Sequence, residues 1–155
     1  MGEIAVNLNN GLNVLSGGTL LEGLMQRGYR LALVAMIKES LALLARSGIT
    51  PAAFGKASPK NMLKILRLPN WLYRLIMQKV VKIDAEARSS MLDDLEAGKP
   101  CEIAYLQGEI VALAARLGTT APINAKVQTM VEDAFKAGAS PKLSGENIYN
   151  AIMEK

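Results

Sequence analysis

The sequence predicts a single all-α domain, and three observations support this. Strand patterns are nearly absent, and almost every segment longer than about ten residues spaces its apolar residues as a helix does. These segments begin at capping residues or prolines and end at glycines. The chain has 155 residues, of which 50% are hydrophobic, so one domain over residues 1–155 can bury a core.

The first two helices are indicated by an asparagine-rich apolar segment and by a capping box. Residues 4–13 form the apolar segment, which we expect to be helical. Thr19 and Glu22 then form a capping box that opens a long helix, for which Gly48 supplies the end. We expect this second helix to be the central one.

Two short helices should follow, one starting at Ser58-Pro59 and the next restarting at Pro69-Asn70. A further helix should be capped by Ser89 or Ser90 and end at about Gly98.

Three helices are expected in the last third of the chain. Pro100 starts one that ends at Gly118, Pro122 starts one that runs to about Ala137, and a short one runs from residue 145 or 146 to the terminus. The helix from Pro100 should bury a regular apolar stripe: Ile103, Leu106, Ile110, Leu113 and Leu117.

Composition excludes several classes of site. With no histidine and a single cysteine, Cys101, the chain has no disulfide framework, no histidine-based metal cluster and no imidazole-containing triad. Nothing beside Cys101 in sequence would activate a thiolate, so we interpret it as structural. A reducing, cytoplasmic location fits best. No apolar run reaches the ~18 residues of a membrane helix, and no signal peptide pattern opens the chain.

Positive charge is concentrated in the middle of the chain. Residues 40–83 contain eight lysines and arginines and no acidic residue, although the whole chain carries only +4. Nucleic acid is disfavoured as a partner because the stretch has few stacking aromatics, Trp71 and Tyr73, and no recognisable binding motif. A solvated helical face is favoured, and an anionic substrate or cofactor phosphate is the alternative.

Four asparagines in the first helix are unusual, since asparagine in a helix interior is less favourable than alanine by roughly 0.6 kcal/mol. Glu3, Asn7 and Asn10 fall on one face at helical spacing. Such a polar strip can line a ligand cleft, where amides donate to and accept from a carboxylate or hydroxyl. The alternative, favoured by composition alone, is that the amides satisfy buried backbone groups or face water.

Ser90 and Glu102 are further candidates with structural alternatives. Ser90 either caps its helix or binds substrate, and capping is favoured from the pattern. Glu102 lies at the border of the stripe that starts at Ile103 rather than opposite it. A glutamate in a first helical turn is also favoured by the helix dipole, so both interpretations of Glu102 stay open.

The same residues belong to a longer pattern. Residues 89–94 read S-S-M-x-x-D, residues 102–108 read E-I-x-x-x-x-G, and Pro122 and Asn124 close the pattern as P-x-N. This pattern resembles the C-terminal domain of ketopantoate reductase (2-dehydropantoate 2-reductase). Residues 4–16 and 69–91 are also similar to that domain, so the resemblance covers nearly the whole chain.

The resemblance implies an α-helical domain of the 6-phosphogluconate dehydrogenase C-terminal type, which follows a Rossmann domain that binds NADPH. A small 2-oxo acid, ketopantoate or a similar one, would sit between the two domains and be reduced, and such domains form homodimers. Residue by residue, Glu102 matches the active-site glutamate, Ser90 a substrate-binding serine and Asn7 an asparagine of the cleft. Asn10 is carried over as well, although the alignment after Asn7 could shift by one residue.

One position departs from the family. Glu3 stands where the family has its catalytic lysine, which protonates the substrate carbonyl oxygen as hydride arrives. An ionised carboxylate cannot donate that proton or stabilise an alkoxide. Either residues 1–3 are an artificial start, or this is a member with altered chemistry.

The sequence also lacks a G-x-G-x-x-G motif after a strand. We therefore expect the Rossmann domain to be absent and the chain alone to hold no cofactor and be inactive. The alternative is a free-standing helical interaction module with the same fold and no redox chemistry.

Overall fold

The computed structural model describes residues 2–49, 58–80 and 84–154, with side chains described from Asn7 onwards except for Val80. Every element in these ranges is helical and none is a strand, which confirms the all-α prediction. None of the described helices is long and apolar enough to cross a membrane.

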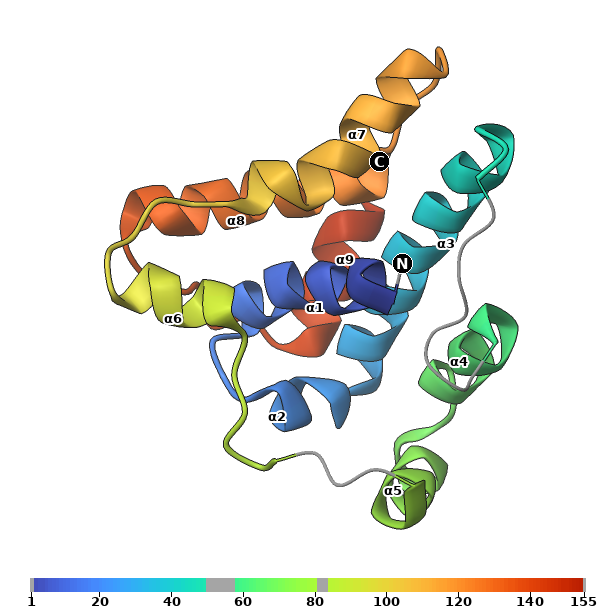
Figure 1. Ribbon diagram of the computed structural model, residues 1–155. Helices are drawn as coiled ribbons and strands as arrows, with labels where there is room; N and C mark the ends of the chain where they lie inside the picture. The colour runs from blue at the N-terminus through green and yellow to red at the C-terminus, as the bar shows by residue number, and fades with distance from the viewer. Residues whose placement is uncertain (1, 50–57, 81–83, 155) are drawn as a thin grey trace.

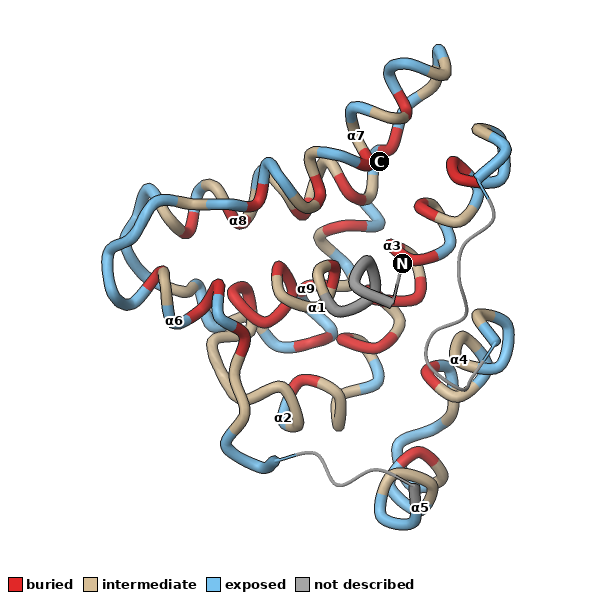
Figure 2. Tube along the Cα trace, viewed as in Figure 1, coloured by how far each residue is buried: buried red, intermediate tan, exposed pale blue. Residues whose placement is uncertain are grey.

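Helix α1 (Gly2–Ser16) lies in the centre of the molecule and contacts several other helices (Figure 1). Its neighbours include α6 (Ser90–Glu96), α8 (Pro122–Ala137) and α9 (Gly145–Met153). Figure 2 shows buried positions along α1 and on the inner sides of its neighbours. Four of its described apolar side chains are at most 1% exposed, and burial of each contributes about 1.5–3 kcal/mol: Leu8, Leu12, Val14 and Leu15.

The long helix predicted to open at Thr19 is two helices, α2 (Leu20–Leu24) and α3 (Arg27–Arg46). The capping box of Thr19 and Glu22 is present as predicted, with bonds of 2.8 and 3.1 Å. The prediction of one continuous helix was wrong because Gln26 is extended and its side-chain oxygen accepts the backbone N–H of Gly145 at 2.7 Å. This contact with α9 outweighs local helix propensity.

Glycine allows α3 and α9 to approach closely. A Cβ on Gly28 would lie 2.6 Å from the backbone nitrogen of Glu146, and one on Gly145 would lie 2.5 Å from that of Tyr29. Only a residue without a side chain fits at either position.

The two short helices predicted in the basic stretch are confirmed as α4 (Pro59–Leu66) and α5 (Asn70–Val80). Arg30 of α3, which is fully buried, joins them to the rest of the molecule. Its guanidinium lies 4.1 Å from the ring centre of Tyr73 on α5. It donates hydrogen bonds of 2.6–3.0 Å to four neutral acceptors: the carbonyls of Leu24, Leu66 and Leu68 and the side-chain oxygen of Asn70.

The start predicted for the helix at Pro100 was also wrong. The chain forms a short 3₁₀ helix, η1 (Ile103–Tyr105), bends at Leu106, and only then enters α7 (Gln107–Arg116). The backbone of Leu106 has φ −109° and ψ −82°, which is outside the helical range. Glu102 therefore precedes a single 3₁₀ turn instead of lying in the first turn of a long helix.

Helix α8 begins at Pro122 and ends at Ala137 as predicted, and α9 agrees with its predicted start. The side chain that caps α8 comes from α3. The Glu39 carboxylate accepts the backbone N–H groups of Ile123 and Asn124 at 3.0 and 2.8 Å and the Asn124 side-chain amide at 2.7 Å. Asn124, the last residue of the P-x-N pattern, thus has a structural role.

Candidate functional site

The four asparagines of α1 fall into two pairs with different surroundings. Asn9 accepts the phenol O–H of Tyr29 at 2.6 Å. Asn13, fully buried, donates to the carbonyl of Gly18 at 3.0 Å and accepts a backbone N–H from the start of α6. Asn7 and Asn10 are half-buried, and their amides bond to no other described residue. Packing therefore explains Asn9 and Asn13, whereas for Asn7 and Asn10 the two interpretations, facing water or lining a cleft, both stay open.

The order of residues around α1 shows what flanks this second pair. At ~100° per residue, Asn13, Asn10, Asn7 and Gly11 follow one another around the helix at steps of about 40–60°. Asn13 contacts the start of α6. On the other side, a Cβ on Gly11 would lie 2.6 Å from Nε2 of Gln107, the first residue of α7. Asn7 and Asn10 thus lie on the strip of α1 between Asn13, which contacts the start of α6, and Gly11, which faces the first residue of α7.

The adjacent serines at the start of α6 have separate roles. Ser89 is buried and caps the helix, its hydroxyl accepting the N–H of Leu92 at 3.2 Å. Ser90 is the first helical residue, is exposed, and its hydroxyl bonds to no other described residue. The capping interpretation of Ser90 was therefore wrong, because Ser89 performs that role.

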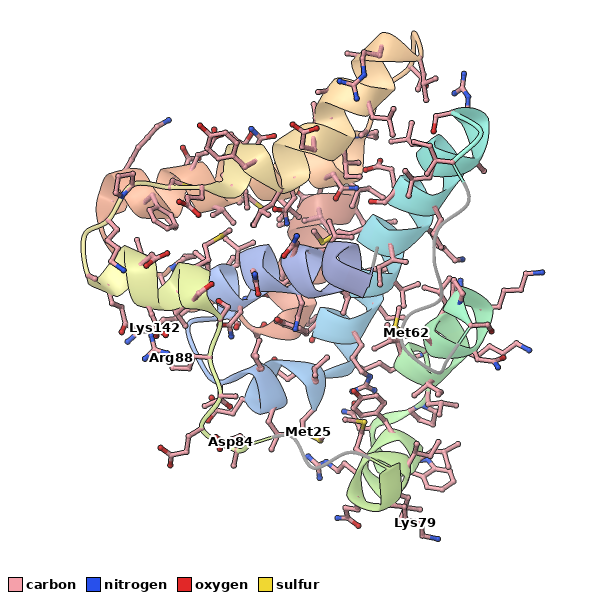
Figure 3. All side chains as sticks on the ribbon, viewed as in Figure 1. Met25, Met62, Lys79, Asp84, Arg88 and Lys142 are labelled. Atoms are coloured by element: carbon pink, nitrogen blue, oxygen red, sulfur yellow. The ribbon has the colours of Figure 1, made fainter. Side chains whose placement is uncertain are left out.

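Arg88 holds the segment before Ser90. Its guanidinium lies 2.7 Å from the Glu96 carboxylate and 3.3 Å from that of Asp93, both on α6 (Figure 3). These ion pairs are partly exposed and each contributes at most about 1 kcal/mol. Their effect is to fix the path by which the chain enters α6.

Glu102 is exposed and makes no capping hydrogen bond to η1. Its predicted place at the border of a buried helical face is not observed, because the chain is not helical there. The next residue, Ile103, is 1% exposed, and its Cδ1 atom lies 3.2 Å from where a Cβ on Gly11 would be. Glu102 is thus attached to the segment that packs on α1.

Asn7 thus lies on α1, Ser90 at the start of α6 and Glu102 just before η1, and both α6 and η1 contact α1. No hydrogen bond or ion pair joins Asn7, Ser90 and Glu102 within the described part of the chain, so their convergence on one ligand stays a prediction. Glu3 occupies α1 four residues before Asn7, and its side chain lies outside the described residues.

Two amides position these elements, and one of them, Gln107, was missed by sequence reasoning. Asn13 links α1 to Ser89, and Gln107 is fully buried with Nε2 3.5 Å from the carbonyl of Leu8. The Gln107 side-chain oxygen bonds to no described group. The available signal was Gly11, since glycine inside a helix costs about 1 kcal/mol relative to alanine.

The described residues do not fit a nucleotide cradle or a metal site. They contain no strand that could lead into a glycine-rich turn and helix, which is how a Rossmann domain holds a dinucleotide. In the same ranges no three Cys, Asp or Glu side chains are grouped as metal ligands would be. Cys101 is half-buried, and burial raises the pKa of its thiol, which agrees with a structural role.

Comparison with protein families gives one match, a family model described as "Ketopantoate reductase PanE/ApbA C terminal", over residues 3–134. The chain belongs to this family. The match confirms the resemblance seen in the sequence and includes Asn7, Ser90 and Glu102. In this ketopantoate reductase C-terminal domain, α9 lies beyond the matched residues. Searches of curated proteins and of solved structures found no significant match.

Proposed function

We propose that this chain is the substrate-binding and dimerisation domain of a cytoplasmic, NADPH-dependent reductase that converts ketopantoate, or a similar small 2-oxo acid, to its 2-hydroxy acid. The observation that carries the proposal is the division among the α1 asparagines. Asn9 and Asn13 are used in packing, whereas the amides of Asn7 and Asn10 bond to no other described residue.

The side chains supply the hydrogen bonds that such a substrate needs. A 2-oxo acid presents carboxylate and carbonyl oxygens, which take donors, and ketopantoate adds a hydroxyl, which takes an acceptor. The amides of Asn7 and Asn10 and the hydroxyl of Ser90 are donors, and the Glu102 carboxylate is an acceptor. NADPH, which supplies the hydride when bound, would be held by a separate Rossmann domain.

The family has a proton-donating lysine at the position that Glu3 occupies in this chain. A carboxylate at position 3 cannot protonate the carbonyl oxygen when ionised. We therefore infer that the chain alone is inactive, both because Glu3 replaces lysine and because its described residues include no strand that could lead into a nucleotide cradle.

The test is a fusion that places the nucleotide-binding domain of a related reductase ahead of Gly2, with and without Glu3→Lys. We expect NADPH oxidation with ketopantoate only in the Lys form, and Glu109→Lys, on the exposed side of α7, serves as the matched charge control. A folded fusion that binds NADPH but stays inactive with lysine at position 3 would contradict the proposal and favour a free-standing interaction module.

Self-association is supported by an exposed apolar face on α5. Trp71 and Leu75 are 65% and 49% exposed and lie one helical turn apart. Exposed apolar patches commonly mark contact surfaces. We expect light scattering to give a dimer for the unaltered chain and a monomer for Trp71→Ser, and a strict monomer at high concentration would contradict dimerisation.

A further inference from the structure

A polar cavity of about 720 Å³ lies between α2, α3, α5 and the start of α9. This volume is within the range of small-molecule sites. Met25, labelled in Figure 3, lies between α2 and α5 and lines the cavity. None of the candidate residues Asn7, Asn10, Ser90 and Glu102 lines it.

Two arginines from different helices, Arg27 of α3 and Arg74 of α5, line this cavity. No carboxylate in the described part of the chain lies within ion-pair distance of either one. A third guanidinium, that of Arg30, lies buried one turn along α3 and bonds only to neutral oxygens, one of them on Asn70, which also lines the cavity. Three positive charges therefore lie at or beside this cavity, and none of them forms an ion pair with a described carboxylate.

Arg27 lies where a cation is disfavoured. It is the first residue of α3, where unbonded N–H groups give the helix a positive end. Gln26, the residue that would cap this end, bonds instead to Gly145 of α9 and makes no capping bond to its own helix. Burial lowers the pKa of Arg30; the nearby Tyr73 opposes this shift, and the charge of Arg27 adds to it as the smallest of the three causes.

Two glutamates, Glu22 and Glu146, also line the cavity, and each only partly offsets the charge of an arginine. Glu22 accepts the N–H of Thr19 within the capping box, and Glu146 lies in the first turn of α9. Both carboxylates thus lie at the positive ends of helices, which partly neutralise them. With Arg30 included, three guanidinium groups stand against two carboxylates, which leaves one excess positive charge.

We propose that this cavity binds the anionic group of a small organic ligand, a phosphate or a carboxylate, through Arg27 and Arg74. Guanidinium groups recognise both anions with two parallel hydrogen bonds. The site also uses residues of α9, which the family match does not include. It is independent of the function proposed above.

The test is a nuclear magnetic resonance titration of the unaltered chain with sodium phosphate at constant ionic strength, repeated with acetate and with chloride. We expect saturable shifts of the backbone amides of Gly23 and Gly28. Phosphate and acetate distinguish the two anion classes, and tighter binding of either one supports the site. Arg27→Gln and Arg74→Gln should each weaken binding about tenfold, since each removes a charge-assisted hydrogen bond.

Arg116→Gln, at an exposed position at the end of α7, is the matched control and should leave binding unchanged. Arg74→Lys, which keeps the charge, should bind with intermediate affinity, and a native-like spectrum for each variant shows that it is folded. The proposal is overturned by shifts that do not saturate, by equal shifts with chloride, or by equal affinities in all variants.

Discussion

The side-chain oxygen of Asn13 accepts the backbone N–H of Ser89 at 3.0 Å, across 76 residues of sequence. This bond joins the central helix to the residue immediately before Ser90. Because Ser89 also caps α6, one buried amide on α1 determines where α6 begins and where the Ser90 hydroxyl lies.

Asn13→Ala should therefore reduce the free energy of unfolding by about 2–4 kcal/mol, because the Ser89 N–H and the Gly18 carbonyl both lose their partner. Urea denaturation measures this loss. Asn10→Ala, where the amide bonds to no other described residue, should change stability by less than about 0.5 kcal/mol. Equal effects of the two variants would contradict the division of the asparagines.

The neighbouring serines give a second comparison. Ser89→Ala removes a helix cap and should cost about 1 kcal/mol, whereas Ser90→Ala should leave thermal unfolding nearly unchanged. In the active fusion with lysine at position 3, Ser90→Ala should mainly raise KM. A loss of stability in Ser90→Ala as large as that in Ser89→Ala would show that Ser90 has a structural role.

Glu102→Gln tests the carboxylate separately. Since Glu102 is exposed and caps nothing, its replacement should not change the urea midpoint. In the same active fusion it should lower kcat by about 10²-fold or more, the lower end of what general acid–base catalysis contributes. Unchanged steady-state kinetics would remove Glu102 from the site.

Gly11→Ala probes the contact between α1 and α7. The added methyl would lie 2.6 Å from Nε2 of Gln107, so we expect a loss of about 1–3 kcal/mol despite the better helix propensity of alanine. Gln107→Ala removes the clashing amide, and the double variant should lose less than the sum of the two single losses. Additive losses in urea titrations would contradict this contact.

Stability at alkaline pH should depend on Tyr29. Burial raises the pKa of its phenol well above the usual value of about 10, so the folded state keeps the proton while the unfolded state loses it. The free energy of unfolding should fall above about pH 10, by up to ~1.4 kcal/mol per pH unit for this group. Tyr29→Phe should flatten the pH profile, and Tyr105→Phe, at an exposed position, is the control. An unchanged slope in Tyr29→Phe would contradict this account.

The helix starts that were predicted correctly depend on local chemistry. Ser58 before Pro59, and Pro122, begin helices because their own side chains or fixed φ angles favour that conformation. The break at Gln26 depends on Gly145, more than a hundred residues later, and no local pattern announces it.

The same distinction applies to the candidate site. Sequence reasoning identified an excess of asparagine on α1 because propensity disfavours it. Which asparagines are structural depends on Tyr29 and Ser89, which become neighbours only in the folded chain. Likewise, the choice between Ser89 and Ser90 as the cap follows from the buried position of the former.

Arg30 has a consequence for how the molecule opens. Its hydrogen bonds hold the end of α4, the turn before α5 and the first residue of α5 to the body of the fold. Because one guanidinium carries all of these bonds, they break together when this side chain is released. The amide protons of α4 and α5 should then exchange with solvent as one cooperative group, at a lower free energy than those of α1, so that the two helices behave as a single foldon.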